Sequence, residues 1–415
     1  MERLIINGGR RLRGEISVSG AKNAGLPVMA AAALCDDVCI IDNLPYVKDI
    51  IIMAQLLRAM GAEVEFSPAG RAVIDPRGIR NVIPPEDMVA KMRASTYLMG
   101  ILLGRFNEAC VPPPGGCSIG ARPIDQHLRG FEALGARVSE GEYLTLKADK
   151  LVGSDVYLEA SVGATINIIL AAAKAEGVTV IHGCAKEPHV VDVANFLNNM
   201  GASIRGAGTD TIRIRGVKNL RSTSYTIIPD QIETGTWMII AAATKGDVVI
   251  KNCIPTHMEV VSDKLRKAGA EVIEGDDYLR VSCDGELTAT NIRTMVYPGF
   301  PTDLQQPMSA MLTVARGRSV ITETIYEQRY RHLEEMRRMG AKVQVEDRVA
   351  FIDGVDKLYG RTVEASDLRA GAALIVAGLI AEGTTTIGGV KYIDRGYERI
   401  EDKLIGIGAD VRREL

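Results

Sequence analysis

The hydrophobic positions of this chain follow a pattern that is repeated six times. In each copy a segment of helical periodicity ends in an apolar–Gly–Ala–x–Val/Ile signature, after which apolar and polar residues alternate as in a strand. Glycine directly after a helix usually adopts the left-handed conformation that ends the helix. The pattern therefore predicts a helix followed by a strand at six places. The signature glycines are Gly61, Gly135, Gly201, Gly269, Gly340 and Gly408.

A second apolar segment precedes each of these signature helices. It is rich in Ala, ends in a short polar or glycine turn and runs into a β-branched strand, as residues 164–175 do before 178–181. A helix that is apolar on nearly every side is buried, whereas the signature helices are amphipathic and should face water. The buried helices are expected to begin at or near Asn23, Arg93, Gly163, Glu233, Asp303 and Asp367.

The repeating unit is thus a buried helix, a strand, an amphipathic helix and further strands. Three such units make a domain of ordinary size, and 415 residues exceed what one hydrophobic core usually supports. We therefore predict two domains of three units each, with helices inside, sheets outside and a boundary near residues 224–230. One long solenoid is the alternative, which the absence of distinct end caps disfavours.

Composition narrows the class of protein. With 49 basic and 52 acidic residues the net charge is −3, so neither nucleic acid nor an anionic membrane is expected as a partner. No apolar signal segment follows the charged residues 2–3, and the longest apolar runs are too short to span a bilayer. The seven cysteines and five histidines show no disulfide or metal spacing. We expect a reduced, cytoplasmic protein without a metal.

One segment stands outside the repeats. Residues 112–125 are rich in proline and glycine around Cys117 and Arg122, which predicts a shaped loop that leads into a helix near Ile124. A thiol near a cation has a lowered pKa and is reactive, so the loop could be catalytic. The alternative is a tight connection with a buried, inert thiol.

Polar residues gather at the starts of the predicted buried helices. Free N–H groups there attract phosphate or carboxylate, and six such starts could converge on a cleft between two domains. Asp and Ser at these places are usually only caps. Lys22, Arg93 and Arg369 oppose the helix dipole instead, so each needs an anionic ligand or a nearby carboxylate. Arg395, before the last helix, could be solvated or could point into the cleft.

Seven motifs, in order along the chain, resemble the UDP-N-acetylglucosamine 1-carboxyvinyltransferase family of enolpyruvyl transferases. The resemblance covers essentially the whole chain. The motifs are SGAKN at residues 19–23, MRAS at 92–95, PGGCSIGARP at 114–123, SVGAT at 161–165, PDQIETG at 229–235, FPTD at 300–303 and DRGYER at 394–399.

The resemblance implies a two-domain, inside-out α/β barrel of six βαβαββ-type units, three per domain, with buried helices and outer sheets. It places residues 22–229 in an N-terminal domain that carries the catalytic loop 112–125. Residues 1–21 and 230–415 form the C-terminal domain, and the active site lies in the cleft between the domains. The repeat pattern alone does not reveal that the start of the chain joins the C-terminal domain.

The resemblance also implies the chemistry. The family transfers the enolpyruvyl group of phosphoenolpyruvate to the 3′-hydroxyl of UDP-N-acetylglucosamine, by addition and then elimination of phosphate, and uses no cofactor. Cys117 is then the general acid towards the methylene carbon and Asp303 the general base, with Lys22 and Arg395 also catalytic. The residues expected at phosphoenolpyruvate are Lys22, Asn23, Cys117, Arg122, Arg329, Arg369 and Arg395. The residues expected at the nucleotide sugar are Arg93, Arg122, Pro123, Ile124, Asp125, Gln126, Ser161, Val162, Gly163, Asp303 and Ile325.

Two positions depart from the family's common form, because Ile166 and His189 stand where Glu is frequent. We expect them to affect local packing or affinity and to leave the reaction unchanged. The nearest rival is the sister enzyme 5-enolpyruvylshikimate-3-phosphate synthase, which lacks the Pro-Gly-Gly-Cys loop. The other alternative, a non-catalytic paralogue that binds a UDP-sugar, has no need for an acid and a base together.

Overall fold

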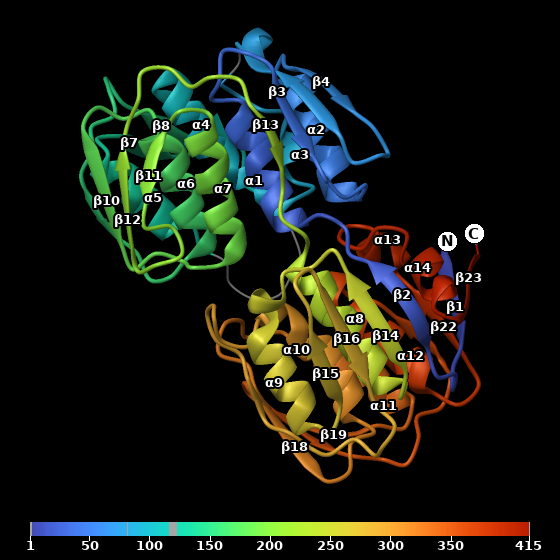
Figure 1. Cartoon of the computed structure of the whole chain (residues 1–415). Coiled ribbons are helices and arrows are strands. Elements are labelled where there is room, and N and C mark those ends of the chain that lie inside the picture. The colour runs from blue at the N-terminus through green and yellow to red at the C-terminus, as the bar shows by residue number, and fades with distance from the viewer. Residues whose placement is uncertain (1, 81, 116–122, 415) are drawn as a thin grey trace. The chain divides into compact units, whose positions relative to one another are not determined.

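The computed structural model describes residues 2–80, 82–115 and 123–414, and the chain divides into two compact units (Figure 1). Of these residues, 20–80, 82–115 and 123–228 form one unit, and 2–19 and 229–414 form the other. Each unit has its own hydrophobic core of Ile, Val, Leu, Met and Ala. Two separate cores favour two domains over one continuous solenoid.

Each predicted buried segment contains a helix. These helices pack on one another within their own unit, α4 on α1 and α6, and α10 on α8 and α12. In α12 every side chain from Leu368 to Leu379 is buried, as a helix that is apolar all round requires. The helices are α1 (Lys22–Ala32), α4 (Tyr97–Phe106), α6 (Val162–Ala172), α8 (Gln231–Ala243), α10 (Thr302–Leu312) and α12 (Leu368–Ile380).

The second of these helices begins later than predicted. Arg93 opens a 3-10 helix, Arg93–Thr96, and α4 itself begins at Tyr97. The Ser95 hydroxyl donates hydrogen bonds to the carbonyl oxygens of Met92 and Val89, at 2.7 and 3.0 Å. Such local side-chain bonds compete with regular helical bonding, which explains the tighter first turn.

The amphipathic helices end where the signature predicts. Each signature glycine has a φ between 93° and 110°, the left-handed region that only glycine enters without strain. A short strand follows each one, as predicted. The helices are α2 (Lys48–Ala59), α5 (Asp125–Ala133), α7 (Pro188–Asn199), α9 (Glu259–Lys267), α11 (His332–Arg338) and α14 (Ile400–Gly406).

Strands lie around the buried helices of each unit (Figure 1), which confirms the inside-out α/β arrangement. In the unit of residues 20–228 the described strands form three sheets. The first has the order β13 (Ser224–Thr226), β3 (Cys39–Asp42), β5 (Ala72–Asp75), β4 (Glu63–Phe66), and the second has the order β6 (Glu108–Val111), β8 (Leu144–Lys147), β7 (Arg137–Glu140). The third has the order β11 (Ser203–Arg205), β12 (Thr211–Arg215), β10 (Val178–His182), β9 (Asp155–Tyr157).

The described strands of the other unit also form three sheets. The first has the order β15 (Glu271–Glu274), β16 (Tyr278–Ser282), β14 (Asp247–Lys251), β2 (Arg13–Ser17), and the second has the order β17 (Ile292–Arg293), β18 (Arg318–Thr322), β20 (Val349–Asp353), β19 (Lys342–Glu346). The third has the order β21 (Thr362–Glu364), β22 (Thr384–Gly388), β1 (Arg3–Asn7), β23 (Asp410–Glu414).

Residues 2–19 belong to the same unit as the second half of the chain because of their strand pairing. Strand β1 lies antiparallel between β22 and β23, and β2 pairs in parallel with β14. The chain leaves this unit after Ser19 and returns to it after Ile228. Shorter described helices are α3 (Glu86–Val89), α13 (Val390–Ile393) and the 3-10 helices Pro76–Gly78 and Pro255–Met258. None of the described helices has the length and apolar character needed to cross a membrane.

Candidate active site

In the unit of residues 20–228, the first candidate cation has a carboxylate partner. Lys22 is the first residue of α1, and its Nζ lies 3.1 Å from Asp49 Oδ2 in the first turn of α2. Both side chains are buried. The carboxylate that Lys22 needs at this helix start is thus Asp49 of the neighbouring helix. Asn23 is the second residue of α1.

The starts of α5 and α6 lie beside each other in this unit. The His127 ring is close to Gly163, where an added Cβ would lie 3.0 Å from ring atom Cε1. The His127 Nδ1 is also 2.8 Å from Asn167 Nδ2. Burial and then the charge of Arg93 lower the pKa of His127 to about 4, so the ring is neutral at pH 7. Sequence reasoning did not include this histidine among the site residues.

The other nucleotide-sugar candidates in this unit surround the same corner. The Ser161 hydroxyl accepts a hydrogen bond from the Ala164 N–H and so caps α6, whose first residues are Val162 and Gly163. Gln126 Oε1 accepts one from the Glu159 N–H at 2.9 Å. Pro123, Ile124 and Asp125 lead into or open α5. Cys117 and Arg122 lie outside the described residues.

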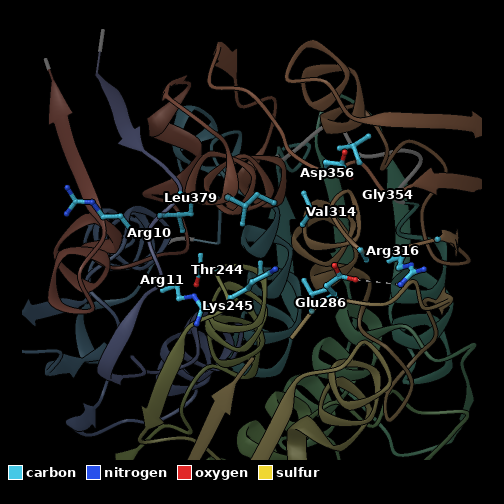
Figure 2. Close-up of a pocket in the computed structure, with 17 residues that line it drawn as sticks. Arg10, Arg11, Thr244, Lys245, Glu286, Val314, Arg316, Gly354, Asp356 and Leu379 are labelled. Atoms are coloured by element: carbon cyan, nitrogen blue, oxygen red, sulfur yellow. Dashed lines mark ion pairs between the residues drawn. The ribbon is translucent and has the colours of Figure 1, made fainter. Parts of the chain in front are cut away.

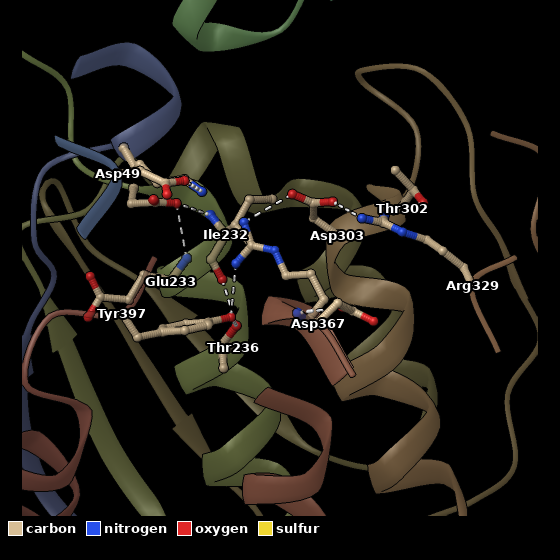
Figure 3. A network of polar contacts seen from close by, with 12 residues as sticks. Asp49, Ile232, Glu233, Thr236, Thr302, Asp303, Arg329, Asp367 and Tyr397 are labelled. Atoms are coloured by element: carbon tan, nitrogen blue, oxygen red, sulfur yellow. Dashed lines mark hydrogen bonds and ion pairs between the residues drawn. The ribbon is translucent and has the colours of Figure 1, made fainter. Parts of the chain in front are cut away.

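In the unit of residues 2–19 and 229–414, Asp303 lies between two arginines (Figure 3). Its Oδ1 accepts a hydrogen bond from Arg329 Nη2 at 2.7 Å, and its Oδ2 one from Arg369 Nη2 at 3.0 Å. Asp303 stands in the first turn of α10 and Arg369 in that of α12, so two neighbouring helix starts bring them together. We call Arg329, Asp303 and Arg369 the Asp303 clamp.

The clamp continues into a buried hydroxyl pair. Arg369 Nη1 donates to the Tyr397 hydroxyl at 3.1 Å, and that hydroxyl lies 2.8 Å from Thr236 Oγ1 (Figure 3). Burial disfavours the charge of Arg369, but Asp303, Tyr397 and Asp230 together outweigh it and raise the pKa of the guanidinium. Asp367 accepts hydrogen bonds from the Arg369 and Ala370 N–H groups, the cap role expected of Asp at a helix start.

Two remaining candidates lie in connecting segments. Ile325 follows β18, and its N–H donates to Glu323 Oε1 at 2.9 Å. Arg395 lies between α13 and α14, two residues before the Tyr397 that contacts Arg369. Among the described residues, no three His, Cys, Asp or Glu side chains are grouped as a metal site would require.

One cavity of the described structure lies away from these residues. A cavity of about 600 Å³ lies where α8, α10 and α12 end (Figure 2). The candidate residues Asp303 and Arg369 stand at the opposite ends of α10 and α12, in their first turns. Its lining includes Ala315, two residues before the left-handed Gly317. None of the candidate residues line this cavity.

The chain is similar to known proteins over its full length. The family described as EPSP synthase (3-phosphoshikimate 1-carboxyvinyltransferase) matches residues 6–404. A protein of Caldanaerobacter subterraneus subsp. tengcongensis named UDP-N-acetylglucosamine 1-carboxyvinyltransferase 3 is 55% identical, over 100% of this chain and 99% of its own. A UDP-N-acetylglucosamine 1-carboxyvinyltransferase of Clostridium botulinum is 51% identical, over 100% of both chains.

Solved structures share the fold. The enolpyruvyl transferase NikO from Streptomyces tendae aligns with a TM-score of 0.90 at 26% identity, covering 99% of this chain and 98% of its own. EPSP synthase from Acinetobacter baumannii aligns with a TM-score of 0.76 at 19% identity over 100% of both chains, which shows the fold alone. The chain therefore belongs to the EPSP synthase family of enolpyruvyl transferases, and within it to the proteins named UDP-N-acetylglucosamine 1-carboxyvinyltransferase.

Proposed function

We propose that this enzyme transfers the enolpyruvyl group of phosphoenolpyruvate to the 3′-hydroxyl of UDP-N-acetylglucosamine and releases phosphate, in peptidoglycan synthesis. The observation that carries the proposal is the Asp303 clamp, in a chain whose full-length relatives bear the name of this activity. A carboxylate is thereby held against two cations that a small anionic substrate can also bind.

The proposed roles are those that the family resemblance implies. Asp303 takes the proton of the sugar hydroxyl, whose oxygen attacks carbon 2 of phosphoenolpyruvate, while Cys117 gives a proton to the methylene carbon. In the second step phosphate leaves carbon 2, and the methyl carbon loses a proton to restore the double bond. Lys22, Arg122 and Arg395 hold the phosphate, and Arg329 and Arg369 add positive charge.

The clamp suggests when the base becomes active. Two guanidinium groups at 2.7 and 3.0 Å stabilise the ionised form of Asp303 and make it a poor proton acceptor. An anionic substrate that draws Arg329 and Arg369 to its own oxygens weakens that stabilisation. The carboxylate then gains basicity only when phosphoenolpyruvate is present, which limits unproductive proton transfer.

The nucleotide sugar is proposed to bind beside the starts of α5 and α6. There Arg93 supplies a cation for the diphosphate, and Ser161, Val162 and Gly163 present the start of a buried helix. Asn23, Arg122–Gln126 and Ile325 complete the proposed substrate contacts. No cofactor enters this scheme, because the two substrates supply every atom and electron of the transfer.

We also propose a cytoplasmic location. The described cysteines are all free thiols, as is usual in a reducing compartment. A disulfide between any two of them in protein purified without reductant would contradict this.

Phosphate release from phosphoenolpyruvate tests the function. We expect release with UDP-N-acetylglucosamine and none with shikimate 3-phosphate. The second acceptor is included because the matching family is described by EPSP synthase. Release with shikimate 3-phosphate alone would assign the sister activity, and release with neither acceptor would favour a non-catalytic protein.

A further inference from the structure

A carboxylate that sequence reasoning missed lies beneath the clamp. Glu323 follows directly after β18 and its side chain is fully buried. Among the described residues it forms no ion pair, although a buried charge is costly unless hydrogen bonds satisfy it. Four donors do so. They are Thr294 Oγ1 at 2.8 Å, Thr302 Oγ1 at 2.9 Å, the Ile325 N–H at 2.9 Å and the Tyr326 N–H at 3.2 Å.

The two carboxylate oxygens hold different parts of the site. Oε1 accepts from the turn that contains Ile325 and Tyr326. The Tyr326 ring in turn lies 4.9 Å from the guanidinium carbon of Arg329, within the range of a cation–π contact. Oε2 accepts from Thr302, the first residue of α10 and the neighbour of Asp303.

Thr302 connects Glu323 to Arg329 through the direction of its hydroxyl group. A hydroxyl has one proton, and the Thr302 proton is donated to Glu323. The oxygen lone pairs are therefore free to accept from Arg329 Nη1, which lies at 2.7 Å. The other end of the same guanidinium donates to Asp303. Glu323 thus contacts both neighbours of Arg329, the turn of Ile325 and Tyr326 and Thr302, without touching Arg329 or Asp303 itself.

We propose that Glu323 is a positioning residue for the transfer reaction. It fixes Thr302 and the Ile325–Tyr326 turn, and through them the Arg329 guanidinium that holds Asp303. The inference rests on the proposed function, since it assigns Glu323 to the same site. A displacement of about 1 Å in such a group can cost about 10²-fold in rate, so the second layer matters although it touches no substrate.

The substitution Glu323→Gln perturbs this layer with little change of shape. The amide oxygen can remain at the Oε1 position, where three of the four donors converge. The amide NH2 then faces Thr302 and donates to it, so the Thr302 proton loses its acceptor and the hydroxyl is no longer oriented by residue 323. The contact between Thr302 and Arg329 is therefore weakened, and the guanidinium is held less firmly on that side. Thr302→Val removes the same connection without changing any charge.

Steady-state kinetics with both substrates tests the proposal. For Glu323→Gln and Thr302→Val we expect kcat to fall by about 10- to 100-fold. The KM for phosphoenolpyruvate should rise several-fold, because Arg329 is a proposed contact of that substrate. The KM for UDP-N-acetylglucosamine should stay within about twofold of wild type, because the Ile325 turn keeps its acceptor.

The matched control is Thr324→Val. Its hydroxyl donates to the Thr294 carbonyl at 2.6 Å, so the variant loses a hydrogen bond in the same loop but outside the path from Glu323 to Arg329. It should keep both KM values and a kcat within about threefold of wild type. A variant that merely contained fewer folded molecules would show a lower apparent kcat with an unchanged KM. A rise in the KM for phosphoenolpyruvate therefore distinguishes a positioning role from poor folding.

Two outcomes would overturn the proposal. One is a Glu323→Gln enzyme with wild-type kcat and KM values, and the other is a Thr324→Val enzyme as impaired as Thr302→Val. Failure of the proposed function is a separate result, since the wild-type enzyme would then release no phosphate with UDP-N-acetylglucosamine.

Discussion

Replacing Asp303 by Asn is expected to destabilise the unit that contains it. Arg329 and Arg369, its partners at 2.7 and 3.0 Å, are only 5% and 6% exposed, so the substitution leaves two buried cations without their carboxylate. Breaking a buried ion pair costs about 3–5 kcal/mol. Asp303 is itself 25% exposed and the Asn oxygen still accepts one hydrogen bond, so we expect a loss of about 2–3 kcal/mol.

Trp237 makes this loss measurable. It is the single tryptophan of the chain and is buried in α8 of the same unit, so its fluorescence reports the unfolding of that unit in denaturant. Asp353→Asn is the matched control, because Asp353 pairs with Arg318 at 2.7 Å on the exposed surface of this unit. Exposed pairs contribute little. Equal shifts of the midpoint in the two variants would refute the reasoning.

The same variant tests the role of Asp303 in catalysis. Loss of a general base lowers kcat by about 10²- to 10⁴-fold. The KM for phosphoenolpyruvate should not rise, because the two guanidinium groups are left free for the anion. A kcat within about threefold of wild type would show that the base lies elsewhere.

Three further outcomes are expected. Fosfomycin, an epoxide mimic of phosphoenolpyruvate, should label Cys117 and spare Cys184, since burial raises the pKa of Cys184 to about 11; mass spectrometry showing spread labelling would count against this. Burial lowers the pKa of His332 to about 4, so unfolding takes up a proton below about pH 6.5. The unfolding free energy of wild type should therefore fall more steeply between about pH 6.5 and 4 than that of His332→Gln, and parallel slopes would argue otherwise. Gly20→Ala should lower soluble yield and thermal stability, because its Cβ would lie 1.6 Å from a backbone carbonyl oxygen, whereas Gly285→Ala meets no atom within 4 Å and should behave as wild type.

The helices could be predicted because their signals are local. A glycine such as Gly201 ends α7 through its own φ of 97°, and the apolar periodicity before it needs no distant partner to be recognised. Arg93 shows the limit of such reasoning. The sequence indicated a helix start there, but two hydrogen bonds of Ser95 made that turn a 3-10 helix.

The partners of the site residues could not be predicted in the same way. The helix-start rule indicated that Lys22 and Arg369 need an anion, and the structure supplies Asp49 and Asp303, which are 27 and 66 residues away. Nothing local marks either carboxylate as the partner. Glu323 has still less signal, because a glutamate after a strand is usually exposed, and only the fold makes it the acceptor of four hydrogen bonds.

The pairing of β1 has a consequence for synthesis of the chain on the ribosome. Asn7 pairs with Thr384 and Arg3 with Glu414, so the first strand must wait for nearly the whole chain before its neighbours exist. At about 5–20 residues per second the delay is roughly 20–80 s. All residues of the unit that ends at Ile228 have been synthesised within that time. During synthesis, the unit that ends at Ile228 should therefore fold before the other unit is complete. Until then β1 and β2 remain as unpaired strands with exposed edges, which a chaperone could protect.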